Sequence, residues 1–221
     1  MDGNGRWARK RKLPRIMGHR SGAKAVDRVT EKCARLGIKA LTLYAFSAEN
    51  WKRPKEEVDA LMDLLRQNLK KNIERLRKNN IRFNVIGRIS SLSDPLKREI
   101  KDTIERTRDN TGMVLTLALN YGGRQEILDA VKAVCQNTHE ESLDVSSWED
   151  ADFGKYLYTG DLPDPDLIIR TSGEMRLSNF LLWQAAYAEF YFTDTLWPDF
   201  GAAEMEKALK EYERRERRFG E

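Results

Sequence analysis

Apolar residues follow two alternating spacings along the chain, and these spacings predict its strands and helices. Short apolar runs indicate strands at 40–46, 81–87, 113–119, 167–169 and 190–192. Helical spacing covers 18–36, 54–79, 94–108, 123–136 and 148–158, a segment from residue 178, and 202–218. Strands separated by helices predict an α/β fold with a mainly parallel sheet and helices on both faces. Residues 137–148, polar and acidic, predict an irregular surface segment.

Polar motifs follow three of the predicted strands directly, at 47–51, 120–124 and 170–178. In parallel α/β sheets, ligands bind beyond the carboxyl ends of the strands. We therefore expect these three motifs to meet in one crevice.

Size and composition fit one well-filled α/β domain. With 221 residues, 40% of them hydrophobic and 33% charged, the chain predicts a single domain over 1–221. No apolar run is long enough for a membrane helix, and the polar start does not resemble a signal peptide, so we expect a cytoplasmic protein. Cys33 and Cys135 both fall in predicted helices and are interpreted as small buried residues, with no disulfide or metal role expected.

Net charge is only +4, but positive charge is concentrated near the amino terminus, at Arg6, Arg9, Lys10, Arg11, Lys12 and Arg15. Such a cluster suits nucleic acid, an anionic membrane surface or a diphosphate, and a solvated basic loop is the simplest alternative. Neither an aromatic sheet signature nor a helix-turn-helix spacing is present, so nucleic acid is not an expected partner.

An anion site is predicted where the strand at 167–169 ends. Arg170 follows a strand that is apolar on both faces, Gly173 permits close approach of the backbone, and Arg176 and Ser178 add donors before the expected helix. The free amides at the start of that helix would also favour negative charge. A surface ion-pair cluster is the alternative interpretation.

The first seven residues form a second candidate anion site. Asp2 stands beside two glycines and Arg6, a combination that suits a metal-bound diphosphate, because glycine amides cradle oxygens and a carboxylate holds the cation. An ordinary Gly-rich loop is the alternative.

Taken together, the stretches 1–7, 42–54, 120–124, 166–184 and 188–200 closely resemble the cis-prenyltransferases, and in particular the bacterial undecaprenyl diphosphate synthases. The resemblance covers essentially the whole chain, in order. It implies a six-stranded, mainly parallel sheet that is not a Rossmann fold, and usually a homodimer. In the family an apolar first strand precedes the Asp2 turn, whereas this sequence has only Met1 there, so the residues of that strand are expected to be missing.

The implied reaction condenses isopentenyl diphosphate onto an allylic diphosphate, typically farnesyl diphosphate, and gives a long polyprenyl diphosphate that serves as a lipid carrier precursor for the cell wall. By the same resemblance Mg²⁺ binds at Asp2 and Glu189, a carboxylate that would be costly unless paired or metal-bound. The expected cradle of the allylic diphosphate comprises Gly3, Asn4, Gly5, Arg6, Trp7, Arg15 and His19.

The other expected roles also rest on the resemblance. Isopentenyl diphosphate is assigned to Arg53, Arg170, Arg176 and Ser178, and the catalytic set to Asp2, Ser47 and Asn50, with the proton acceptor left open among these three. Trp51 and Glu57 are expected to couple lid closure to binding, and 218–220 to reach a phosphate across a dimer interface. Ala45 is expected to line a tunnel near its mouth, and Met113 to close the tunnel floor, so that truncation of Met113 would lengthen the products.

A long product is expected to leave slowly and to contact a membrane surface, so the protein could also sit peripherally at the inner face of the membrane. Two rivals within the family stay open. One is a synthase with a different product length, and the other is a catalytically silent partner subunit, which the presence of Asp2, Arg6, Arg170, Arg176 and Glu189 argues against.

Overall fold

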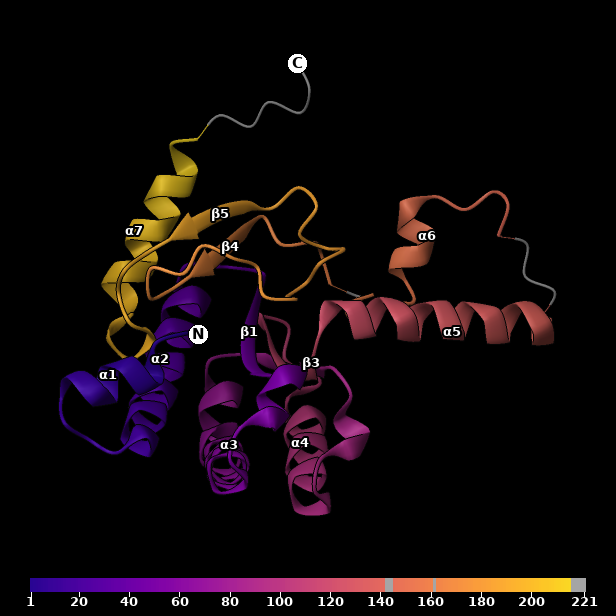
Figure 1. Ribbon diagram of the computed structural model, residues 1–221. Helices are drawn as coiled ribbons and strands as arrows, with labels where there is room; N and C mark the ends of the chain where they lie inside the picture. Colours follow the sequence, from indigo (N-terminus) through magenta and orange to yellow (C-terminus); the bar gives the residue numbers. More distant parts are fainter. Residues whose placement is uncertain (142–144, 161, 216–221) are drawn as a thin grey trace.

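The computed structural model describes residues 1–141, 145–160 and 162–215 (Figure 1). The five strands are β1 (Ala40–Ser47), β2 (Arg82–Ile86), β3 (Val114–Tyr121), β4 (Leu167–Arg170) and β5 (Glu189–Phe192). The helices are α1 (Asn4–Lys10), α2 (Arg15–Arg35), α3 (Lys55–Lys78), α4 (Asp94–Thr107), α5 (Gly123–Glu141), α6 (Asp150–Gly154) and α7 (Ala202–Glu213). Short 3₁₀ turns η1 (Ala48–Lys52), η2 (Ile89–Ser91) and η3 (Trp197–Asp199) connect them. All five strands predicted from the apolar runs are therefore confirmed.

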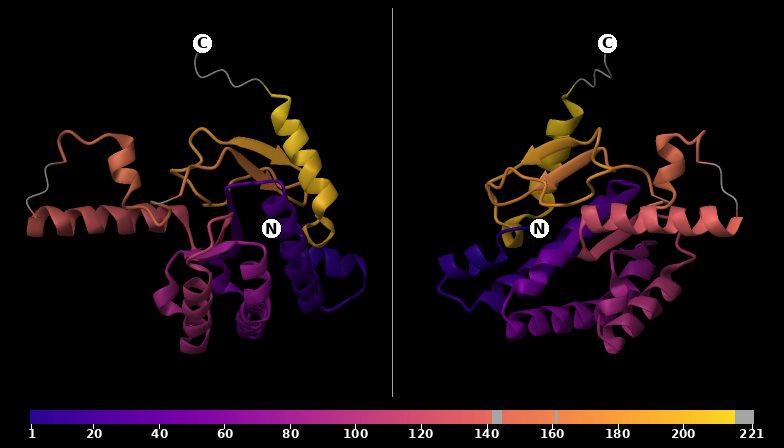
Figure 2. Two further views of the ribbon diagram at one scale, coloured as in Figure 1. Left: turned by 180° about the vertical axis from the view of Figure 1, so that it is seen from behind. Right: turned by 45° about the vertical axis from the view of Figure 1, so that its right-hand side comes forward.

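Three of the strands form a parallel sheet in the order β1-β3-β2. The central strand β3 carries residues that are almost all buried, including Leu115, Leu117 and Leu119, as expected for a parallel strand covered on both faces. Helices α3 and α4 lie side by side along this sheet (Figures 1 and 2). Their buried leucines and isoleucines join β1, β2 and β3 in one hydrophobic core.

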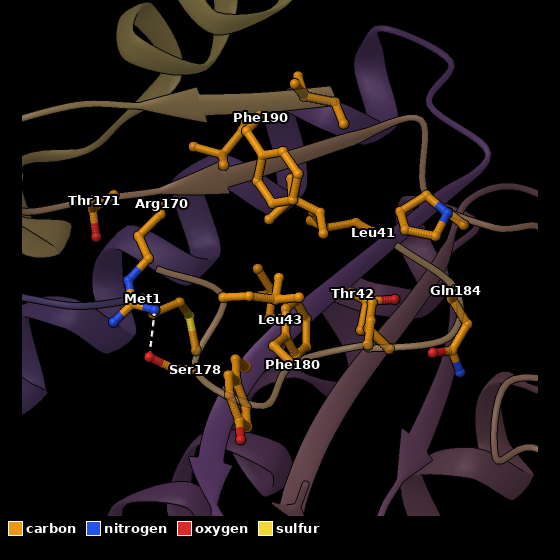
Figure 3. Close-up of a pocket in the computed structure, with 18 of the residues that line it drawn as sticks. Met1, Leu41, Thr42, Leu43, Arg170, Thr171, Ser178, Phe180, Gln184 and Phe190 are labelled. Atoms are coloured by element: carbon orange, nitrogen blue, oxygen red, sulfur yellow. Dashed lines mark hydrogen bonds between the residues drawn. The ribbon is translucent and has the colours of Figure 1, made fainter. Parts of the chain in front are cut away.

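The prediction of a six-stranded sheet is wrong for the described residues. Strands β4 and β5 form a separate parallel pair, and β4 is not hydrogen-bonded to β1. A cavity of about 990 Å³ lies between the two sheets, lined by Leu41 and Leu43 of β1 and by Ile168 and Ile169 of β4 (Figure 3). The sixth strand came from the resemblance alone, and the residues before α1 form no strand in the structure.

Two helix predictions need correction. Residues 4–10 were interpreted as a Gly-rich turn and basic loop, but they form α1, which begins directly after the left-handed Gly3. Conversely, no helix starts at Ser178. Ser178, Asn179 and Leu181 all have positive φ, at 53°, 62° and 45°, which a right-handed helix excludes. This segment is a series of turns, so it offers no helix amides to an anion.

Helix α5 runs past the predicted end at residue 136 to Glu141 and projects away from the sheets together with α6 (Figures 1 and 2). Because α5 lies outside the body, Leu128 and Val131 are exposed, and so is Cys135, which was predicted to be buried. Cys33 in α2 is buried as predicted. Among the described helices, none combines the length and the apolar composition that a membrane crossing requires.

Candidate active site

Asp2, near the amino terminus, is hydrogen-bonded to residues that follow β4 and to the amide of Trp197. Its backbone carbonyl accepts hydrogen bonds from the hydroxyls of Thr171 and Ser172 at 2.9 and 2.7 Å, and from the amide of Trp197 at 3.0 Å. Its carboxylate accepts the Gly3 amide at 2.7 Å and an Arg170 guanidinium nitrogen at 3.2 Å. Partial burial opposes ionisation of Asp2, but the bonds from Gly3 and Arg170 outweigh it and lower the pKa of the carboxyl. Asp2 is therefore a fixed anion.

Gly3 permits this junction for two physical reasons. Its φ of 102° is a left-handed conformation that side chains rarely adopt, and a Cβ there would lie 2.1 Å from Ser172 Oγ. The first backbone bond of α1 runs from the Trp7 amide to the Gly3 carbonyl, so the amides of Asn4, Gly5 and Arg6 have no intrahelical acceptor. These amides are the predicted anion cradle, although they belong to a helix start and not to a loop.

The start of α2 faces this cradle and adds cationic groups. Glu57 of α3 lies 3.1 Å from Arg15, 3.0 Å from Arg53 and 3.7 Å from His19 Nε2. It therefore lies between two residues predicted to bind the allylic diphosphate, Arg15 and His19, and one predicted to bind isopentenyl diphosphate, Arg53. At 3.7 Å the imidazole is too far for a hydrogen bond. Burial, reinforced by Arg53, lowers the pKa of His19 to about 4, so the ring is neutral at neutral pH.

Two buried polar atoms at this point have no hydrogen-bond partner in the described part of the chain, namely His19 Nε2 and Asn4 Oδ1. Both residues line a second cavity, of about 170 Å³. Buried polar atoms without partners are uncommon in folded proteins and call for an explanation. A bound polar group at this end of the cavity would supply the partners.

The predicted anion site at 170–178 is assembled around Arg170. Its guanidinium donates to Ser178 Oγ at 2.7 Å and also to the Arg176 carbonyl, so the three predicted residues lie together (Figure 3). Arg176 pairs with Glu174, and Glu174 lies 2.8 Å from Arg6. The amide of Gly173 is bonded to the Thr193 carbonyl at 2.9 Å, so the predicted amide donor at that position is not free. Side chains, not backbone amides, supply the donors here.

The segment after β1 is fixed by its own polar groups. Ser47 and Asn50 form a reciprocal cap of η1, in which each side chain bonds to the other residue's backbone. Trp51 Nε1 donates to Asn120 Oδ1 at 2.7 Å, so the motif at 120–124 supports the predicted lid. Glu49 accepts a bond from Asn179 at 3.0 Å, which links the lid to the loop after Ser178. The motifs at 47–51 and 170–178 both line the larger cavity, as predicted. The motif at 120–124 contacts the first of them through Asn120 but does not line the cavity.

Only the larger of the two cavities is lined by the charged residues around Asp2. Met1 lines both cavities, and the larger one also contacts Asp2, Ser47, Asn50, Arg53 and Arg170 before it becomes mainly apolar between the sheets. The smaller one lies between β1, β3, α2 and α3, and Ala45 lines it as predicted for a tunnel residue. Met113 is 4% exposed and belongs to the hydrophobic core, but it does not line either cavity.

Glu189 is not brought to Asp2. It pairs in register with Leu167, whereas Arg170 pairs with Phe192, so about 10 Å of strand separates Glu189 from the Arg170 end. It also forms an ion pair with Arg215 at 2.9 Å. Within the described ranges, no three His, Cys, Asp or Glu side chains gather as metal ligands. Asp2 alone fits the way Mg²⁺ is usually held, by one or two carboxylates together with substrate phosphates.

Sequence reasoning missed the residues that hold the site in place. Glu174 lies inside the motif at 170–178 and anchors both Arg6 and Arg176, while Thr171 and Ser172 bind the Asp2 carbonyl. A carboxylate between two arginines was a usable signal for Glu174. The predicted segment 218–220 lies outside the described residues.

Comparison with known proteins gives the same family throughout the chain. Residues 1–220 match the family model described as "Putative undecaprenyl diphosphate synthase". The isoprenyl transferase of Geobacter sulfurreducens is 53% identical over 220 residues, covering 100% of this chain and 89% of the relative. That of Bacillus subtilis is 51% identical over 220 residues, covering 100% and 85%.

Two solved structures share the fold. The lavandulyl diphosphate synthase of Lavandula x intermedia, crystallised with dimethylallyl diphosphate, aligns with a TM-score of 0.96 at 38% identity, covering 100% of this chain and 95% of that one. A probable undecaprenyl diphosphate synthase of Campylobacter jejuni aligns with a TM-score of 0.79 at 39% identity, covering 91% and 92%. The chain therefore belongs to the undecaprenyl diphosphate synthase family of isoprenyl transferases, and it is an enzyme that transfers prenyl groups.

Proposed function

We propose that this enzyme condenses isopentenyl diphosphate onto an allylic diphosphate, farnesyl diphosphate in the first round, and repeats the step to give undecaprenyl diphosphate. One observation carries the proposal: a dense set of cations and free amides opens into apolar cavities. The cations and amides suit a diphosphate, and the apolar cavities suit a prenyl chain. Family membership supports prenyl diphosphates as the substrate class.

In each round the allylic C–O bond breaks and diphosphate leaves with the electron pair. A new C–C bond forms to the terminal alkene carbon of isopentenyl diphosphate, which leaves positive charge on the methyl-bearing carbon. The CH2 group next to that carbon, on the diphosphate side, then loses a proton to give the cis double bond. We assign the leaving diphosphate to the α1 amides of Asn4 and Gly5, with Arg6, Arg15 and His19, because Asn4 and His19 line the smaller cavity and Arg15 lies against Gly5. Preorganised donors of this kind stabilise charge that develops on a leaving group.

The second diphosphate is assigned to Arg170, Arg176 and Ser178, with Arg53 contributing from the lid. Arg170 donates to Ser178 Oγ and to the Arg176 carbonyl, and all four residues line the larger cavity. Asp2, fixed between Gly3 and Arg170, is the residue we assign to Mg²⁺, which when bound offsets negative charge on the departing diphosphate. The lowered pKa of Asp2 makes it a weak base. We therefore assign the proton to a diphosphate oxygen, with Ser47 and Asn50 orienting the substrate.

Incubation with farnesyl diphosphate, radiolabelled isopentenyl diphosphate and Mg²⁺, followed by chromatographic sizing of the dephosphorylated products, tests this proposal. The expected result is an 11-unit polyprenol whose formation stops when EDTA is added. No incorporation of label by a folded protein would overturn it.

A short-chain synthase is the second candidate, favoured by one observation. The lavandulyl diphosphate synthase, crystallised with dimethylallyl diphosphate, aligns over the whole of this chain with a TM-score of 0.96. If dimethylallyl diphosphate alone yields a ten-carbon product, this second candidate replaces the long-chain one.

We also propose a homodimer that releases its product at a membrane surface. Exposed apolar side chains on the projecting α5 and on the turns before β5 suit a second copy, namely Leu128, Val131, Trp183 and Tyr187. Light scattering should give twice the mass of one chain, and Val131→Asp should lower it toward one.

A further inference from the structure

The segment 3–26 carries a strong local excess of positive charge. It holds eight Lys and Arg side chains and no Asp or Glu, whereas the whole chain has a net charge of only +4, so the rest of the chain is net negative. Arg6 and Arg15 are assigned to the leaving diphosphate. The other cations of this segment have no role in the reaction.

Most of these cations lie at the turn between α1 and α2, whose backbone is fixed by hydrogen bonds. The Leu13 amide is bonded to the Ala8 carbonyl at 2.9 Å. The Lys12 amide is bonded to the Arg9 carbonyl at 3.1 Å, and Lys12 has a left-handed φ of 55°. This pair of bonds is a Schellman motif, a common way to end a helix. The turn lies on the opposite side of the molecule from α5, so it is separate from the α5 surface proposed for the dimer (Figures 1 and 2).

Cations and apolar side chains are interspersed at this turn. Leu13 and Met17 are 39% and 36% exposed, although both are apolar. A guanidinium nitrogen of Arg20 lies 3.9 Å from Met17 Sδ, so a cation also flanks the thioether. We call the following exposed residues the basic corner: Arg9, Lys10, Lys12, Leu13, Met17 and Arg20.

The cations of the basic corner are poorly neutralised by the protein itself. Three of them form no ion pair with any residue that the structure describes: Arg9, Lys10 and Lys12. Arg11, which stands between them in the sequence, does pair with Asp199, at 3.4 Å. On α4, by contrast, charges of both signs alternate, and Lys97 pairs with Asp94 at 2.7 Å. An ordinary solvated helix surface has the mixed charge of α4, and the basic corner does not.

The chemistry of the basic corner favours an anionic lipid surface. Lipid phosphates would partner the unpaired cations, and each Lys or Arg near such a surface strengthens binding roughly fivefold. Apolar side chains among cations are typical of segments that insert at the boundary of headgroups and acyl chains. A nucleic acid offers no apolar phase to Leu13 and Met17. Its bases would stack on exposed aromatic rings, but the Trp7 ring is covered by Arg11, whose guanidinium carbon lies 4.1 Å from the ring centroid.

The basic corner also lies close to the diphosphate end of the site. The amides assigned to the leaving diphosphate are at the amino end of α1, and the corner begins at its carboxyl end. Helix α1 has 7 residues, so these two ends are about 10 Å apart at 1.5 Å per residue. A lipid surface bound at the corner would therefore lie near the point where the product diphosphate is held.

We propose that the basic corner docks the enzyme on an anionic lipid bilayer, with its cations against the lipid phosphates and its apolar side chains among the headgroups. This inference rests on the proposed function, since it names the surface to which the lipid product would pass.

The test is sedimentation of the protein with vesicles. The wild type should bind vesicles of equal parts phosphatidylglycerol and phosphatidylcholine, should not bind vesicles of phosphatidylcholine alone, and should be released by salt. The variant Arg9→Gln/Lys10→Gln/Lys12→Gln should bind the anionic vesicles roughly 100-fold more weakly, since three cations contribute about fivefold each. The variant Leu13→Gln/Met17→Gln should also bind more weakly, but with the salt dependence of the wild type.

A matched control removes three exposed cations from α4 and the turn after it, in the variant Arg98→Gln/Lys101→Gln/Arg108→Gln. Its net charge equals that of the corner variant, so it should bind vesicles like the wild type if position and not total charge decides. An equal loss in this control, or wild-type binding by the corner variant, would overturn the inference. Retention of short RNA on a filter by a wild type that ignores the vesicles would also overturn it.

Turnover in a non-ionic detergent separates this inference from the proposed function. With farnesyl diphosphate, isopentenyl diphosphate and Mg²⁺, the corner variant should elongate at the wild-type rate, because none of its three residues is assigned to a diphosphate. If the wild type binds anionic vesicles but does not elongate, the proposed function fails alone. If it elongates but does not sediment with the vesicles, the docking inference fails alone.

Discussion

The two ends of the proposed substrate path are built in different ways. At the charged end, the cations are held by carboxylates that come from distant parts of the chain: Arg170 pairs with Asp2, 168 residues away, and Arg6 pairs with Glu174. At the cavity of about 170 Å³, the wall is made by packed elements: Ala45 lies on β1, and α2 and α3 pack beside each other. One end is a set of preorganised donors, and the other is a packed and mainly apolar wall.

This difference suggests a division of tasks. Donors aimed at a developing charge affect the rate and the binding of the diphosphates. A packed wall affects the space that is available for more hydrocarbon in the cavity. Changes at the charged end should therefore alter kinetics at constant product length, and changes to the wall should alter length at constant kinetics.

The largest effect is expected from Asp2→Ala. Removal of an electrostatic stabiliser from a transition state lowers turnover by ~10²-fold or more, and the thermal unfolding profile should retain a single native-like transition. Asp94→Ala is the control, because Asp94 is also an ionised carboxylate, its pKa lowered by its bond from Lys97 on α4. Near-normal turnover in Asp2→Ala would remove the role assigned to Asp2.

Arg170→Ala and Arg176→Ala test whether the second diphosphate is bound where we assign it. Loss of a charge-assisted pair costs roughly 1.5–3 kcal/mol, or about 10- to 150-fold. The KM for isopentenyl diphosphate should rise by such a factor, far more than the KM for farnesyl diphosphate, while Arg108→Ala on α4 should change neither. Equal increases for both substrates would show that the two diphosphate positions are wrongly assigned.

Ala45→Leu and Met113→Ala separate the cavity wall from the core behind it. Ala45 lines the cavity, so added bulk there should obstruct an early isoprene and shorten the products, at a typical overpacking cost of ~1–3 kcal/mol. Met113 was predicted to close the tunnel floor, and its truncation to lengthen the products. Because Met113 is buried in the core, Met113→Ala should chiefly lower the free energy of unfolding, by ~2–5 kcal/mol.

Product sizing and denaturant unfolding of both variants decide between these outcomes. Longer products from Met113→Ala would restore the original assignment of Met113 to the floor. An unchanged distribution from Ala45→Leu would place the tunnel elsewhere.

The smallest effect concerns pH. The unfolded chain protonates His19 near pH 6.5, whereas the folded protein, with a pKa of about 4, keeps the ring neutral. The folded pKa is the lower one, so this contribution to stability is full above pH 6.5 and is lost as the pH falls toward 4, by roughly 3 kcal/mol at the most. His19→Gln should show a shallower loss of unfolding free energy over this range. Parallel pH profiles for the two proteins would contradict this interpretation.

Much of the fold could be predicted from the sequence because it depends on local apolar periodicity. All five strands in the described residues coincide with short apolar runs, and α2, α3 and α4 coincide with helical spacing. The turns at 178–181 could not be predicted in this way, because Leu181 and its neighbours adopt positive φ in a segment with an apolar, helix-like composition. Hydrogen bonds to distant parts of the chain determine the backbone conformation of these turns, including one from the Leu181 amide to the buried Tyr121 hydroxyl at 3.2 Å.

In the site, too, residues that are close in sequence could be predicted to lie together, whereas contacts between distant segments could not be predicted. Arg170, Arg176 and Ser178 could be grouped from the sequence because they stand close together after one strand. The separation of Glu189 from Asp2 depends on the β4–β5 register, which no local pattern specifies. The ion pair of Asp27 and Arg75 at the smaller cavity was not predicted, because both residues occupy helix positions where charged residues usually face solvent, and only the packing of α2 against α3 brings them to a cavity.

One parallel measurement tests the division of tasks most directly: the KM for isopentenyl diphosphate and the product length of the wild type, Arg176→Ala and Ala45→Leu. The account predicts a raised KM at wild-type product length for Arg176→Ala, and a wild-type KM with shorter products for Ala45→Leu. A KM and a product length that change together in both variants would contradict it.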